Sequence, residues 1–145
     1  MPRAPIDGES LTTMPITALY AGLLALLFVV LALRVIGARR GARVPLGDGG
    51  DATLLRRIRV HANCAEYVPL ALLLIGLAES LKVDARVLHG LGMVLVAGRV
   101  VHAVGVGQAK EWFALRVSGM AATFTVIITA ALTCLFASVR SGLIL

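Results

Sequence analysis

The sequence predicts an all-α membrane protein built as a four-helix bundle, because its apolar residues are too many for a soluble domain and form four long runs. Hydrophobic residues make up 59% of the 145 residues and charged residues 15%, whereas soluble domains are about 45–50% apolar. Each run approaches the roughly 20 residues that a helix needs to cross a bilayer. The expected helices cover about residues 15–38, 53–79, 85–107 and 115–138 of a single membrane domain, 14–145.

The N-terminal residues 1–13 are polar, with Pro2 and Pro5, and we expect them to form a disordered tail. The first helix follows, because no charged residue occurs between Met14 and Leu33. Basic residues come after this apolar run rather than before it. That order favours a retained membrane helix over a cleaved signal peptide.

The second helix carries a polar stripe. At about 100° per residue, Arg56, Arg59, Asn63 and Glu66 fall within an arc of roughly 80° on a segment that is otherwise mostly apolar. Charges inside a membrane are costly and usually face a bundle interior or a wet cavity. The stripe therefore indicates a functional site, and a structural ion pair between helices is the alternative. Pro69 removes one backbone donor and is expected to kink this helix.

The third and fourth helices add polar residues toward the same end of the bundle. Arg99 and His102 are three residues apart near the end of the third helix, and Arg116 opens the fourth. Antiparallel packing would bring them to the depth of the stripe. Two alternatives remain: Arg99 could simply neutralise Glu66, and His102 could be a hydrogen-bonding packing residue.

Several small residues predict packing rather than chemistry. Gly98 and Gly105 share one face of the third helix, and Gly119 and Thr123 share one face of the fourth. Both pairs are typical of close contact between membrane helices. Cys64 lies far around the helix from the stripe, so we interpret it as a small packing residue.

The charge distribution predicts a membrane topology rather than a nucleic-acid partner. The net charge is +6, but the excess Lys and Arg flank apolar spans, where topology and anionic headgroups account for them. By the positive-inside rule, the loop from Arg39 to Arg57 is cytoplasmic and both termini lie outside. The three histidines show no metal-ligand spacing, so no metal site is expected.

Taken together, the polar residues suit a small ligand that bears both carboxylates and an amine. Arginine binds carboxylates in a bidentate manner, and Glu66 can accept a hydrogen bond from an ammonium group. An arginine beside a bound thiol would stabilise its thiolate and so activate a nucleophile. Arg34, Arg39 and Arg40, at the end of the first helix, either join this set or only anchor that helix at the headgroups.

The segment from Arg59 to Leu70, RVHANCAEYVPL, resembles the signature of the MAPEG family, the membrane-associated proteins of eicosanoid and glutathione metabolism. The first loop, residues 35–45, resembles that of leukotriene-forming members. The GRVVH segment, residues 98–102, is similar to the third-helix motif of prostaglandin-E-forming members. The resemblance extends over about residues 16–137, and the second-helix motif is its most specific part.

This resemblance implies a homotrimer of four-helix protomers, similar to microsomal glutathione transferases, in the bacterial inner membrane. Glutathione would be the cosubstrate, bound between protomers on the cytoplasmic side, and would be conjugated to lipophilic electrophiles or used to reduce lipid hydroperoxides. The candidate glutathione-binding residues are Arg34, Arg39, Arg40, Arg59, Asn63, Glu66, Tyr67, Arg99 and His102. The implied catalytic residue is Arg116, which matches the arginine thought to support the thiolate.

One departure from the family pattern keeps a second function open. A Tyr that the family's enzymes often carry one turn after His102 is replaced by Val106. The alternative is therefore a non-catalytic lipid- or glutathione-binding membrane protein. A small transporter is a weaker alternative, because four short helices leave little room for alternating access.

Overall fold

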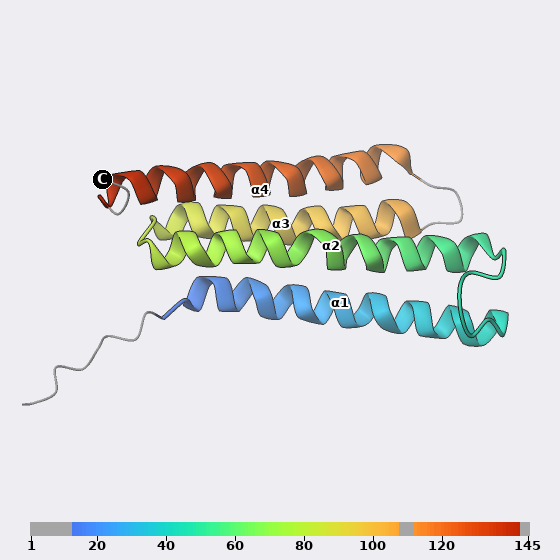
Figure 1. Ribbon diagram of the computed structural model, residues 1–145. Coiled ribbons are helices and arrows are strands. Elements are labelled where there is room, and N and C mark those ends of the chain that lie inside the picture. Colours follow the sequence, from blue (N-terminus) through green and yellow to red (C-terminus); the bar gives the residue numbers. More distant parts are fainter. Residues whose placement is uncertain (1–12, 108–111, 143–145) are drawn as a thin grey trace, which may run out of the picture.

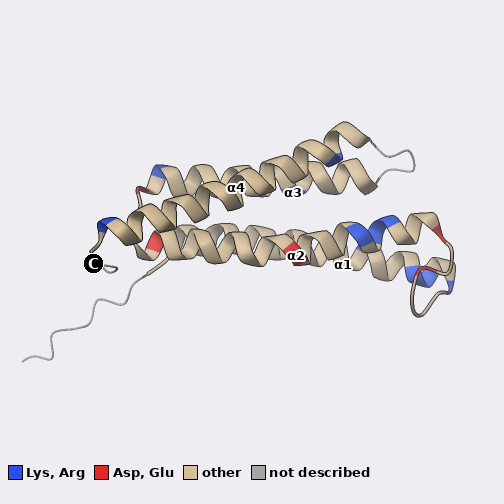
Figure 2. Cartoon of the chain, turned by 45° about the horizontal axis from the view of Figure 1, so that its top comes forward, with Lys and Arg blue, Asp and Glu red and all other residues tan. Residues whose placement is uncertain are grey.

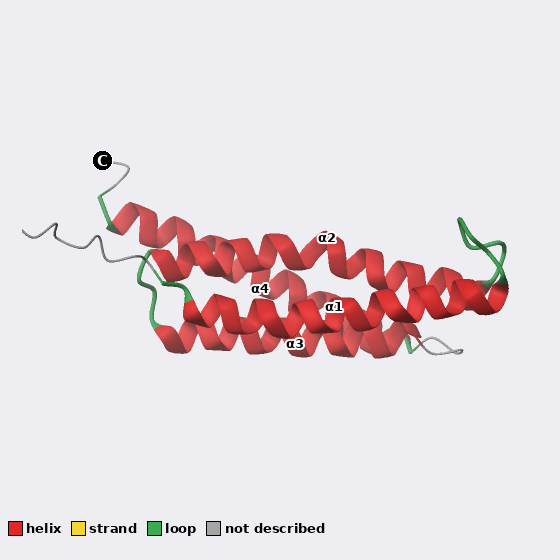
Figure 3. Ribbon diagram, turned by 90° about the horizontal axis from the view of Figure 1, so that it is seen from below, coloured by secondary structure: helices red, strands yellow, loops and turns green. Residues whose placement is uncertain are grey.

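The computed structural model describes residues 13–107 and 112–142, and these form an antiparallel bundle of four helices (Figure 1). The helices are α1 (Pro15–Ala42), α2 (Ala52–Ser80), α3 (Ala85–Gly107) and α4 (Phe113–Arg140). All four are long and apolar enough to cross a membrane. Helix accounts for the regular structure throughout the described residues, as Figure 3 shows. The predicted fold class is therefore confirmed.

Three helix ends, one in α1 and two in α4, differ clearly from the expected bounds. Helix α1 continues to Ala42 instead of ending near residue 38, and stops where Arg43 adopts a left-handed conformation with φ of 55°. Helix α4 begins at Phe113 and ends at Arg140, about two residues further out at each end than expected. The expected disordered tail lies outside the described residues, apart from Thr13. Residues 108–111 also lie outside them.

The packing order places α2 and α3 between α1 and α4. Helices α2 and α3 contact each other and both outer helices, whereas α1 and α4 make no contact within the described residues. Buried apolar side chains from every helix, such as Leu24, Ile75, Leu95 and Val126, form the shared core. Many other large apolar side chains point outward, which is expected where lipid replaces water as the solvent.

Glycines bring α3 and α4 very close together. A Cβ atom placed on Gly119 would lie only 2.6 Å from the carbonyl oxygen of Gly98 and from the amide nitrogen of His102. Thr123, one turn further along α4, is fully buried and donates a hydrogen bond to the carbonyl of Gly119 at 2.9 Å. The close packing predicted for these small residues is confirmed, and it fixes the start of α4 against the end of α3.

A carboxylate from α2 caps the beginning of α1. The Glu79 side chain accepts hydrogen bonds from the backbone amides of Ile16 at 2.9 Å and Thr17 at 2.7 Å. The residue before α1, Met14, offers no side-chain cap of its own. A negative charge is favourable at a helix N-terminus, so Glu79 ties the two helices together at the end of the bundle where α1 begins and α4 ends.

Candidate functional site

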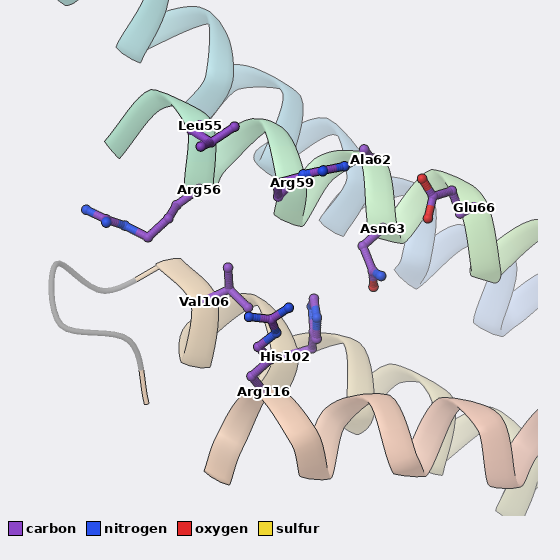
Figure 4. A pocket seen from close by; sticks show the side chains of 9 residues that line it. All are labelled: Leu55, Arg56, Arg59, Ala62, Asn63, Glu66, His102, Val106 and Arg116. Atoms are coloured by element: carbon purple, nitrogen blue, oxygen red, sulfur yellow. The ribbon is translucent and has the colours of Figure 1, made fainter. Parts of the chain in front are cut away.

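A cavity of about 430 Å³ opens between α2, α3 and α4, toward the end of the bundle where α2 and α4 begin. Figure 4 shows its walls: α2 faces the end of α3 and the first turns of α4. The lining residues are Leu55, Arg56, Arg59, Ala62, Asn63, Glu66, His102, Val106 and Arg116. The same end of the bundle gathers most of the Lys and Arg residues of α1 and α2 (Figure 2).

The polar stripe of α2 forms one wall of this cavity. Arg59, Asn63 and Glu66 follow one another along the helix, one turn apart, and all three line the cavity. The Asn63 side chain points toward the opposite wall (Figure 4). Glu66 is exposed, whereas the amide oxygen of Asn63 is buried and has no hydrogen-bond partner. The wall therefore offers a cation, an amide and an anion in that order. Leu55 and Ala62, which are seven residues apart on the same face, supply its apolar part.

His102 and Arg116 form the opposite wall. A Cβ atom on Gly105 would lie 2.7 Å from the amide nitrogen of Arg116, so the start of α4 presses directly against α3 at this point. This contact brings Arg116 beside His102 and Val106, which are one turn apart on α3 (Figure 4). The His102 side chain is 4% exposed and is held between the two helices.

Arg99 is buried one turn from His102, with 2% of its surface exposed. Its Nη2 atom lies 4.0 Å from the sulfur of Met120, and its Nε and Nη1 atoms have no hydrogen-bond partner. Among the described residues, no ion pair joins Arg99 to Glu66. The suggestion that Arg99 simply neutralises Glu66 is therefore not supported within one chain.

The arginines of α1 lie away from this cavity. The guanidinium of Arg34 covers the end of α3, because a Cβ atom on Gly107 would lie 3.1 Å from its Nη2. Arg39 donates a hydrogen bond to the carbonyl of Gly47 at 2.7 Å, and it lines a separate hollow of about 360 Å³ with Arg40. The structure thus brings five of the predicted site residues together around the cavity and leaves those of α1 outside it; the five are Arg59, Asn63, Glu66, His102 and Arg116.

Tyr67 also lies outside the cavity lining. Its ring packs edge-on against Phe124 of α4, with 5.4 Å between the ring centroids.

The apolar lining residues Leu55, Ala62 and Val106 were not predicted as site residues. Leu55 and Ala62 are seven residues apart on the face of α2 that carries the polar stripe, and Val106 is four residues from His102 on α3. This spacing is the sequence pattern from which they could have been predicted. Within the described ranges, no three His, Cys, Asp or Glu side chains cluster as metal ligands.

The fold and this cavity define a class: a multi-pass, all-helical membrane protein with a polar, arginine-rich cavity at one end of its bundle. Comparison with known proteins gives the family. The sequence profile of the MAPEG family matches residues 17–136. The inner membrane protein YecN of Escherichia coli (strain K12) is 38% identical over 113 residues, which cover 78% of this chain and 85% of YecN. YecN of Escherichia coli O6:H1 shows the same values. The chain belongs to the MAPEG family.

Proposed function

We propose that this protein binds glutathione in the cavity between α2, α3 and α4 and transfers it to lipophilic electrophiles that enter from the bilayer. The observation that carries the proposal is the convergence of Arg59, Asn63 and Glu66 with His102 and Arg116 around one cavity. Its volume of about 430 Å³ lies within the usual range for small-molecule sites, about 300–1,000 Å³. MAPEG membership supports the choice of ligand.

The order of groups along α2 matches the order of groups in an extended tripeptide. Arg59 and Glu66 are seven residues apart, which is about 10 Å along a helix. Three extended residues also span about 10 Å. Arg59 would bind a carboxylate at one end of the ligand, Glu66 would accept from the ammonium at the other, and Asn63 would pair with a peptide amide between them. The absence of a hydrogen-bond partner for the amide oxygen of Asn63 within the described residues supports this role.

Arg116 is the proposed catalytic residue, since it faces the α2 stripe from across the cavity (Figure 4). A guanidinium beside a thiol favours ionisation of the thiol, and the released proton passes to water. In conjugation, a carbon–sulfur bond forms while the leaving group departs with its electron pair. In peroxide reduction, two glutathione molecules become one disulfide as the hydroperoxide becomes an alcohol and water. Arg99, which is buried and forms no ion pair with the described residues, adds positive potential one turn from His102.

We also propose a homotrimer, because a single chain leaves the α2 side of the cavity exposed and keeps the arginines of α1 outside the cavity. Glu66 and Leu70 of α2 are exposed in the single chain, and Arg39 and Arg40 lie outside its own cavity. A neighbouring protomer packed against α2 would cover the stripe and could supply its own Arg39 and Arg40. Light scattering of the protein in mild detergent, with the detergent mass subtracted, should give three chains. A monomer mass would refute this assembly.

The proposed location is a bacterial inner membrane, with both termini outside and the basic loops in the cytoplasm. The name of the Escherichia coli relative, an inner membrane protein, supports the membrane. The gathering of cations where α1 ends and α2 begins supports the orientation (Figure 2).

A non-catalytic binding protein is the second candidate, and Val106 is the observation that favours it. Val106 lines the cavity one turn after His102, and no described lining residue carries a hydroxyl group that could donate to a thiolate. A chromogenic-electrophile assay on the detergent-purified protein separates the two candidates. Glutathione-dependent turnover above the rate in detergent alone supports the transferase. Saturable glutathione binding without turnover would replace it with the binding protein.

A further inference from the structure

A second basic cavity, of about 560 Å³, lies at the end of the bundle opposite the candidate functional site. It is bounded by the connection between α2 and α3, residues 81–84, and by the last turns of α4. Two cations line it: Lys82 from the connection and Arg140 from the end of α4. Figure 2 shows fewer basic segments at this end of the bundle than at the other end. Lys82 and Arg140 are therefore separate from the basic residues that gather where α1 ends and α2 begins.

The carboxylate in this cavity does not neutralise the two cations. Asp84 accepts hydrogen bonds from the backbone amide of Arg86 at 2.8 Å, from its Nε at 3.1 Å and from its Nη2 at 3.2 Å. These bonds hold the pKa of Asp84 below its ordinary value, so the carboxylate stays ionised and paired with Arg86. Among the described residues, no ion pair within 4.0 Å includes Lys82 or Arg140. Lys82 and Arg140 are therefore two cations of the cavity that no carboxylate of the described residues pairs with.

Lys82 occupies a backbone conformation that favours glycine. Its φ is +61°, and its amide closes the end of α2 by donating to the carbonyl of Glu79 at 3.0 Å. A side chain in this left-handed region is disfavoured because its Cβ atom crowds the backbone. Lys82 therefore carries a backbone strain that a glycine at the same position would relieve.

The position of the cavity along the bundle points to the headgroup region. Helix α4 has 28 residues and is therefore about 42 Å long, whereas the hydrocarbon core is about 30 Å thick, so its ends reach the headgroups. Thr133, Phe136 and Arg140 lie on one face of α4, at intervals of three and four residues. Phe136 is 70% exposed and forms an apolar wall one turn from the cation of Arg140.

We propose that this cavity binds the phosphate of an anionic membrane phospholipid, with Lys82 and Arg140 at the phosphate and one acyl chain along the Phe136 face of α4. Two cations without an ion pair among the described residues, next to an apolar wall, match an amphiphile that has a charged head and an apolar tail. A free phosphate ion would use the cations alone. The site does not depend on the glutathione function.

The test measures lipid retained per chain by native mass spectrometry of the purified full-length protein. The protein is titrated in mixed micelles with phosphatidylglycerol or, as the zwitterionic reference, phosphatidylcholine with the same acyl chains. Each cation near an anionic lipid contributes about fivefold in affinity, so Lys82→Gln with Arg140→Gln should weaken phosphatidylglycerol binding by about 25-fold. Arg43→Gln is the matched control, because Arg43 is a cation in the same left-handed conformation as Lys82 and does not line the cavity.

Lys82→Gly separates a binding role from a structural one. Glycine relieves the left-handed strain, so this variant should melt at a higher temperature than the wild type and still bind phosphatidylglycerol about fivefold more weakly. Three results would overturn the proposal: equal binding of the two lipids by the wild type, unchanged phosphatidylglycerol binding in the double variant, or an equal loss in Arg43→Gln. Displacement of the lipid by millimolar inorganic phosphate would assign the site to a free anion instead.

Discussion

Replacing Glu66 with Gln tests whether the polar stripe of α2 is a ligand site or a contact that holds helices together. Glu66 is exposed at the cavity edge, and no ion pair or hydrogen bond within the described residues involves its carboxylate. The folded chain therefore has little to lose when the charge is removed. We expect the melting temperature of the variant to stay within a degree or two of the wild type, as is usual for a surface substitution worth under about 0.5 kcal/mol.

Glutathione affinity should respond strongly to the same substitution. A hydrogen bond between charged groups is worth about 1.5–3 kcal/mol, and the exposure of Glu66 favours the lower half of that range. A loss of about 1.5–2 kcal/mol raises the dissociation constant by about 10- to 30-fold. Isothermal titration calorimetry of both proteins in the same detergent measures this ratio. An unchanged affinity, with the variant normally folded, would refute the assignment of Glu66 to the ligand's ammonium.

Three further outcomes follow from the fold. Gly119→Ala should lower the melting temperature, because its Cβ would lie 2.6 Å from backbone atoms of α3 and overpacking costs about 1–3 kcal/mol; Gly22→Ala, which meets nothing within 4 Å on α1, should not. Glu79→Gln should cost about 1 kcal/mol in thermal or denaturant unfolding, since it removes the charged cap of α1, and an unchanged stability would contradict that role. Reporter fusions after Arg140 and at Gly49 should give opposite sidedness, with the Gly49 fusion cytoplasmic; a shared side would exclude the proposed topology.

The arrangement along each helix was predictable from the sequence. The spacing of Arg59, Asn63 and Glu66 fixes a common face once the segment is helical, and the structure turns that face to the cavity. The antiparallel order of helices likewise puts His102 and Arg116 at the depth of the stripe. Both features depend only on helical geometry and on the short connections between helices, which a sequence determines locally.

The lateral arrangement of the helices was not predictable in the same way. Which face of α1 meets α2 and α3 depends on side-chain packing along the whole bundle, and that packing keeps Arg39 and Arg40 outside the cavity of their own chain. The contact between Glu79 and the start of α1 joins residues more than 60 positions apart. No local sequence pattern indicates that contact, because residue 79 is simply the last residue of the expected second helix. The burial of Arg99 away from Glu66 is a further result of this packing.

The ultraviolet difference spectrum of glutathione bound to the purified protein tests the central proposal most directly, because a thiolate absorbs where a thiol does not. The proposal predicts a thiolate band that saturates with glutathione concentration at neutral pH. In Arg116→Ala the band should be largely lost, whereas the calorimetric affinity should fall much less, since the partner of Arg116 is the thiolate rather than the resting ligand. Saturable binding with no thiolate band in the wild type, or an equally strong band in Arg116→Ala, would contradict the role given to the cavity between α2, α3 and α4.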